Sequence, residues 1–61
     1  MQDSEAIACI KNLCNIAHCT DIQKLEKEMR DKYLKELKEN GLSTRQISRL
    51  TGISRYIILN V

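Results

Sequence analysis

Apolar residues recur every three or four positions in the first part of the chain, which places their side chains on one face of an α-helix. They are Ile7, Ile10, Leu13, Cys14 and Ala17. An acidic or hydroxyl side chain suits the start of such a helix, because it satisfies free backbone N–H groups and opposes the positive end of the helix dipole. The pattern predicts a helix from Asp3 to His18, capped by Asp3 or Ser4.

A second apolar face follows with the same helical spacing. Its members are Ile22, Leu25, Met29, Tyr33 or Leu34, and Leu37. Thr20 and Gln23 have the spacing of a capping box, in which two side chains satisfy free backbone groups of the first turn. A helix over 21–40 is therefore predicted. Gly41 is expected to end it, and Leu42 to pack back into the core.

The last part of the chain predicts two short helices joined by a tight turn. Ser43 and Gln46 repeat the capping-box spacing, so a helix is expected to begin at Thr44. Gly52 suits the left-handed conformation that ends a helix, and Ser54 is placed to cap the next one. Apolar residues occur where two steeply crossing helices share contacts. These are Ile47, Ile53, Ile58 and Val61.

These elements predict an all-α fold, a small bundle of about four helices that ends in a helix-turn-helix. Proline is absent and only two glycines occur, both at predicted helix ends. Residues 1–40 form two supporting helices, and residues 42–61 form the helix-turn-helix with its recognition helix over 54–61. At 61 residues the chain has room for one domain, 1–61, and none for an active-site cleft.

The charged residues are distributed unevenly along the chain. The chain has 10 basic and 8 acidic residues, a net charge of +2. Residues 1–40 hold seven basic and eight acidic residues, whereas residues 41–61 hold Arg45, Arg49 and Arg55 and no acid. A guanidinium group donates bidentately to phosphate and to guanine edges. The segment therefore favours DNA binding, the alternative being an ordinary solvated surface.

A longer string also resembles a known family. Residues 25–55 end in Arg-Gln-Ile-Ser-Arg-Leu-Thr-Gly-Ile-Ser-Arg, and they resemble the C-terminal region of the REP-associated tyrosine transposases of bacteria. That region has a long charged helix, this motif and an apolar-rich last helix. The resemblance covers about residues 20–61 and implies a transposase-derived DNA-binding domain. The family's nuclease domain, with its paired histidines and nucleophilic tyrosine, has no counterpart in this sequence.

The expected mechanism places the helix from Thr44 across the phosphate backbone and the last helix in the major groove. The side chains expected to contact duplex or hairpin DNA are Ser43, Thr44, Arg45, Gln46, Arg49, Ser54, Arg55, Tyr56 and Asn60. Arg55 suits guanine, Asn60 suits adenine, and Arg49 suits phosphate. About three phosphate contacts predict a salt slope of roughly −3.

Two other classes of function stay open. A protein-interaction module, or a homo-oligomer joined through the last helix, would use Ile57, Leu59 and Val61. A zinc adaptor would use Cys9, Cys14, His18 and Cys19, but these cannot converge from a single helix, and no C-x-x-C pair occurs. Free thiols are the simpler expectation.

No catalytic arrangement is predicted, because the Cys–His pair lacks an orienting third group and no glycine-rich loop occurs. We expect neither an enzyme nor a cofactor. The sequence shows no signal peptide pattern and no apolar run near the roughly 18–20 residues that a bilayer requires. The expected location is therefore the cytoplasm, at the nucleoid.

Overall fold

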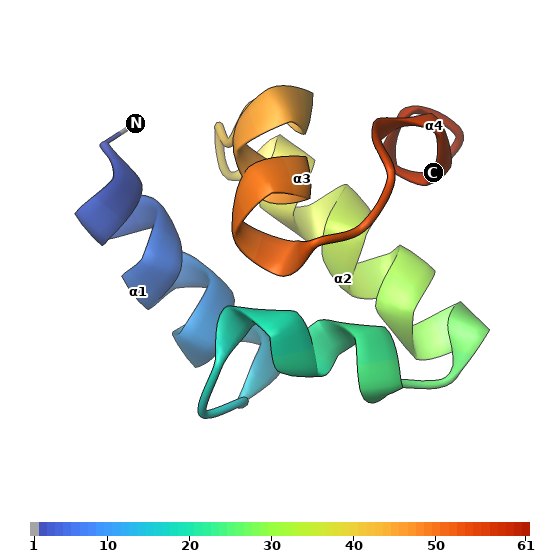
Figure 1. Ribbon diagram of the computed structural model, residues 1–61, viewed down its shortest axis with the longest axis horizontal. Coiled ribbons are helices and arrows are strands. Elements are labelled where there is room, and N and C mark those ends of the chain that lie inside the picture. Colours follow the sequence, from blue (N-terminus) through green and yellow to red (C-terminus); the bar gives the residue numbers. More distant parts are fainter. Residues whose placement is uncertain (1) are drawn as a thin grey trace.

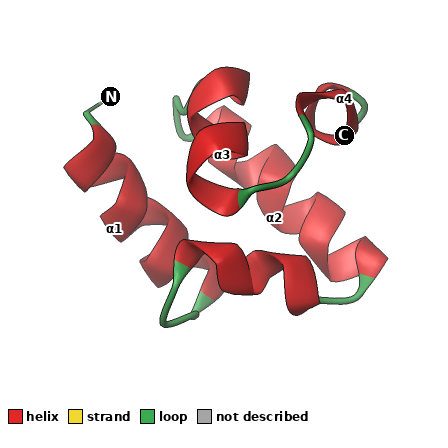
Figure 2. Ribbon diagram, viewed as in Figure 1, coloured by secondary structure: helices red, strands yellow, loops and turns green. Residues whose placement is uncertain are grey.

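The computed structural model describes residues 2–61, and all their regular structure is helical (Figure 1; Figure 2). The elements are α1 (Asp3–Cys14), the 3₁₀ helix η1 (Cys19–Lys24), α2 (Lys27–Glu39), α3 (Thr44–Thr51) and α4 (Arg55–Leu59). No strand occurs in this range, so the predicted all-α bundle is confirmed. None of these helices combines the length and apolar character needed to span a bilayer.

Helix α3 is the centre of the fold, since it packs against every other element. In Figure 1, α1 lies on one side of α3, η1 crosses beneath it, α2 runs behind it and α4 closes the other side. The resulting body measures 25 × 22 × 18 Å. Because α3 is central, its side chains lie close to both α1 and α4.

One core joins all five elements. Each contributes at least one fully buried aliphatic side chain. These are Ile10 of α1, Ile22 of η1, Leu34 and Leu37 of α2, Ile47 of α3 and Ile58 of α4. The predicted core positions at these residues are confirmed, and Leu42 and Ile53 pack into the same cluster from the two turns beside α3.

The first helix is shorter than predicted. It ends at Cys14 because Asn15 adopts the left-handed conformation, with φ of 54°. Asparagine tolerates this region, and the N–H of Ile16 then donates to the carbonyl of Lys11 at 3.2 Å, which closes the helix end. The predicted extension to His18 is therefore wrong, and Ala17 is exposed.

The predicted single helix over 21–40 is also wrong. It divides into η1 and α2, with Leu25 extended between them (φ −75°, ψ 154°). A continuous helix of that length would measure about 30 Å, more than the 25 Å long axis of the molecule. The capping contact differs too, since the N–H of His18 donates to Asp21 Oδ2 at 3.2 Å.

The buried face of α2 is partly as expected. Leu34 and Leu37 are fully buried, whereas Met29, predicted to be internal, is 43% exposed. Met29 lies in the first turn of α2, where the chain has just left the break after η1. The predicted end of the helix is confirmed, because Gly41 has φ of 100° and Leu42 turns inward.

The α3–α4 segment has the predicted bounds at three of its four ends. Ser43 Oγ accepts from the N–H of Gln46 at 3.1 Å, Gly52 ends α3 with φ of 76°, and Ser54 Oγ accepts from the N–H of Tyr56 at 3.2 Å. Helix α4 stops at Leu59, so it is shorter than the predicted span of 54–61. The identity of this pair as a DNA-binding helix-turn-helix stays a prediction.

Hydrogen bonds from Thr51 of α3 and from Gln23 of η1 restrain the α3–α4 turn. The buried hydroxyl of Thr51 donates to the carbonyl of Ile47 at 2.6 Å and accepts from the N–H of Ile53 at 3.3 Å. Gln23 of η1 donates to the Thr51 carbonyl at 2.6 Å. Tertiary contacts therefore fix a turn that the sequence predicts only from its glycine.

Lys38 of α2 anchors α4 from the other side. Its ammonium group donates to the carbonyls of Ile58 and Val61, at 3.1 and 3.0 Å. A cation at a helix C-terminus satisfies free carbonyls and opposes the negative end of the dipole. This contact gives a five-residue helix, too short to persist alone, a fixed place on the bundle.

Candidate nucleic-acid interface

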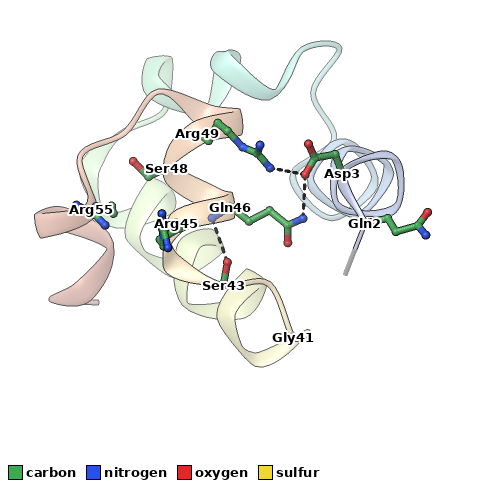
Figure 3. A pocket seen from close by; sticks show the side chains of 9 residues that line it. All are labelled: Gln2, Asp3, Gly41, Ser43, Arg45, Gln46, Ser48, Arg49 and Arg55. Carbon is green, nitrogen blue, oxygen red and sulfur yellow. Dashed lines mark hydrogen bonds and ion pairs between the residues drawn. The ribbon is translucent and has the colours of Figure 1, made fainter.

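An open depression of about 680 Å³ lies where the start of α1, the turn after α2, α3 and the start of α4 meet. Its lining is polar and contains three basic side chains and a single acidic one among the described residues. The lining residues are Gln2, Asp3, Gly41, Ser43, Arg45, Gln46, Ser48, Arg49 and Arg55. Figure 3 shows these side chains around the N-terminal part of α3. We call this region the arginine depression.

The three arginines of the C-terminal segment all line the arginine depression. Arg45 and Arg49 lie four residues apart on α3, so they share one helix face. Arg55 is the first residue of α4, and the turn at Gly52 directs that helix back toward the same face. The tight turn thus gathers charges that are ten positions apart in the sequence.

The arginines differ in what they contact. The side chains of Arg45 and Arg55, both exposed, form no hydrogen bond or ion pair with another residue of the described range 2–61. Arg49, by contrast, forms an ion pair with Asp3, with Nη2 2.5 Å from Oδ1. Two of the three guanidinium groups are therefore directly available to an anion.

Gln46 does not lie open to a DNA phosphate. It is only 9% exposed, and its amide nitrogen donates to Asp3 Oδ1 at 3.2 Å. Its neighbours fit the expectation better, because Ser43 is exposed and Thr44 is half-buried. The Ser43 hydroxyl oxygen serves as the helix cap, while its proton stays available for donation.

Of the α4 side chains expected to contact DNA, some already form hydrogen bonds within the protein and others do not. Tyr56 is 77% exposed beside Arg55. Asn60 Nδ2 donates to the carbonyl of Tyr56 at 2.7 Å, which uses the amide to close the end of α4. Ser54 caps the same helix and is exposed. Tyr56 and Arg55 are therefore the α4 side chains best placed to meet a ligand.

Four lining residues are not among the predicted DNA contacts, namely Gln2, Asp3, Gly41 and Ser48. Asp3 was expected only as a helix cap, although the N-cap position belongs to Gln2. Its contact with Arg49 joins residues 46 positions apart, a separation that no local pattern signals. Ser48 lies between Arg45 and Arg49 on α3 and adds a small polar side chain to the arginine depression.

The cysteines lie elsewhere, and the described residues contain no group of three or more His, Cys, Asp or Glu arranged to hold a metal. Cys9, Cys14 and Cys19 are free thiols. Burial, then the negative charges of Cys9, Glu36 and Cys19, raises the pKa of Cys14 from 9.0 to about 11. Cys14 is therefore an inert core residue at neutral pH.

Comparisons with protein-family models, with curated proteins and with solved structures gave no match.

Proposed function

We propose that this chain binds DNA through the arginine depression, with α3 against the phosphate backbone and α4 entering the major groove. The observation that carries the proposal is the convergence of Arg45, Arg49 and Arg55 on one surface, two of them without a protein partner in the described range. Guanidinium groups on a shared, open surface complement the charge of a phosphate backbone.

The roles follow from exposure and contacts. Arg45 and the Ser43 hydroxyl lie at the N-terminal end of α3, where they suit phosphate contacts that set the register on the duplex. Arg55 and the exposed Tyr56 open α4, so they suit base edges or the flanking phosphates. Asn60 and Gln46 are engaged within the protein and have no direct role in this proposal.

An α-helix with its side chains is about 10–12 Å in diameter, which fits a major groove roughly 12 Å wide, and the five residues of α4 span only about 7.5 Å along the helix axis. Such a short helix reads few base pairs. The resemblance to the C-terminal region of REP-associated tyrosine transposases supports the same proposal, since it implies a DNA-binding domain. The small number of charged contacts implies modest affinity. We therefore propose a transposase-derived DNA-binding domain of modest affinity.

The test is fluorescence anisotropy with labelled duplex and hairpin DNA over a salt series. With two available arginines the wild type is expected to show a slope of log K against log salt of about −2. An Arg45→Ala/Arg55→Ala variant should lose binding while keeping its helical circular dichroism. The matched control is Lys32→Ala/Lys35→Ala, which removes the same charge from exposed positions of α2 outside the arginine depression.

Two results would contradict the proposal. One is no binding by the wild type even at low salt. The other is equal loss in the arginine and lysine variants, because that would reduce the effect to net charge.

Self-association through α4 is the second candidate, and one observation favours it. Tyr56 and Leu59, three residues apart on α4, are 77% and 66% exposed. Ile57 and Val61, however, are half-buried against the core, which leaves a narrow apolar surface. A sedimentation mass that rises with protein concentration would support this candidate.

A further inference from the structure

One acidic side chain lies within a surface whose other charges are all basic. Asp3 opens α1, and its Oδ1 atom accepts from Arg49 Nη2 at 2.5 Å and from Gln46 Nε2 at 3.2 Å. Figure 3 shows both side chains reaching from α3 toward the carboxylate at the start of α1. The carboxylate thus holds the arginine in the manner expected of a phosphate oxygen.

The position of Asp3 is set by the fold. Ala6 and Ile10, the next residues along α1 to face inward, are fully buried in the core. They fix the first turn of α1 beside α3, and the 9% exposed Gln46 ties the carboxylate to that helix. Asp3 is therefore held within the arginine depression by packing on either side.

The ion pair itself is open to exchange. The side chains of Arg49 and Asp3 are 65% and 50% exposed. Solvent screens an exposed pair, so it adds little to stability, and a competing anion can displace the carboxylate. A DNA phosphate approaching Arg49 meets the same guanidinium group and is repelled by the adjacent carboxylate.

We propose that Asp3 is a built-in competitor of phosphate, which occupies Arg49 in the free protein and keeps the DNA affinity of the arginine depression low. This inference rests on the proposed DNA-binding function. It assigns Arg49 a latent phosphate contact, whereas Arg45 and Arg55 are available from the start. Removal of the Asp3 charge releases the third contact.

The direct test is Asp3→Asn, which keeps the shape of the side chain and an acceptor oxygen for Gln46 but removes the charge. One released phosphate contact should steepen the salt slope by about 0.9 and tighten binding roughly eightfold at about 0.1 M salt. The measurement is the anisotropy titration described above. Asp3→Ser, a good helix-start residue, is a second variant should the first unfold.

The matched control is Glu5→Gln. Glu5 is exposed two residues further along α1, carries the same charge and does not line the arginine depression. It should change affinity much less than Asp3→Asn does. Equal effects of the two variants would overturn the proposal, because they would reflect net charge alone.

A double-mutant cycle separates action through Arg49 from a general charge effect. In an Arg49→Ala background no guanidinium group is left to release, so Asp3→Asn should no longer tighten binding eightfold. A gain that persists undiminished in this background would overturn the proposed route through Arg49.

The DNA-binding function and the role of Asp3 predict different outcomes. Wild-type binding that depends on Arg45 and Arg55 but does not change in Asp3→Asn would overturn this inference and leave the DNA-binding function standing. Absence of binding by both wild type and Asp3→Asn at low salt would overturn the function itself, and the inference with it. Binding by Asp3→Asn alone would support both.

Discussion

Individual polar side chains couple helices that lie far apart in the sequence. Gln23 reaches the carbonyl of Thr51, and Lys38 reaches the carbonyl of Val61, across separations of 28 and 23 residues. Each contact satisfies a backbone group at a helix end, where the helix itself offers no partner. Asp3 differs from these, because its partners are the side chains of Gln46 and Arg49, and we propose that its carboxylate acts on binding.

Cys14 provides a pH-dependent test of stability at the level of a single residue. Its thiol, 5% exposed, has a pKa raised to about 11 by burial and by nearby negative charge, against 9.0 when unfolded. Between these values the unfolded state binds fewer protons than the folded state, so stability falls as pH rises from about 9 to about 11. We expect a loss of roughly 2 to 3 kcal/mol from this group.

Urea unfolding at about pH 8 and about pH 11 measures this loss. Cys14→Ala should remove its share of the decline. Cys9→Ala should keep most of it, because burial is the larger cause of the raised pKa of Cys14. An equal decline in wild type and Cys14→Ala would contradict the assignment.

At the scale of elements, helix ends define the surface that the helices present. Ser43 and Ser54 cap α3 and α4, and Gly52 turns the chain between them in a left-handed conformation. This turn is what brings Arg55 back toward Arg45. A change in the turn should therefore act on the arginine depression as well as on stability.

Gly52→Ala tests that turn, with Gly41→Ala as the matched control. Both glycines have positive φ, 76° and 100°, but a Cβ at Gly41 meets nothing within 4 Å, whereas one at Gly52 lies 2.5 Å from Gln23 Nε2. Backbone strain alone should cost about 1 kcal/mol at Gly41. At Gly52 the lost Gln23 hydrogen bond should raise the cost to about 2 to 3 kcal/mol.

Thermal unfolding followed by circular dichroism measures both costs. Adding Gln23→Ala to Gly52→Ala removes the clash, so the further cost of the glycine change should approach that at Gly41. Equal costs at the two glycines from the outset would mean that Gln23 does not restrain the turn.

At the scale of the whole molecule, all five elements depend on one shared core for their stability. Ile22 belongs to the 3₁₀ helix yet is fully buried, like Ile58 of the five-residue α4. Helices this short are not stable alone in water. The domain should therefore unfold in a single cooperative step, with the arginine depression lost together with the core.

Ile22→Ala tests this cooperativity. It removes three carbons from the centre of the core and should cost about 2 to 4 kcal/mol, a large share of the stability of a small domain. Leu59→Ala removes the same number of carbons from a side chain that is 66% exposed, and it should change stability by no more than about 0.5 kcal/mol.

Helical circular dichroism and tyrosine fluorescence should report the same unfolding midpoint in both variants. Separate midpoints for the two signals would show that part of the bundle unfolds alone, against a shared core.

Local signals predicted the C-terminal half better than the N-terminal half. Ser43, Gly52 and Ser54 act within a few residues of themselves, so their spacing suffices to predict where α3 and α4 begin and where α3 ends. Asn15 gave no comparable signal, because asparagine adopts the left-handed conformation only where context favours it. The break at Leu25 has no local breaker at all, so no short-range signal predicts it.

By itself, then, the sequence determined an all-α chain, the bounds of its central helix and the concentration of arginines in its last third. These features depend on periodicity, capping and charge, which act over a few residues. The tertiary structure decided where the chain turns back between η1 and α2, which arginines are free, and that Asp3 holds Arg49. Those outcomes depend on packing between segments up to 46 residues apart, which no local pattern encodes.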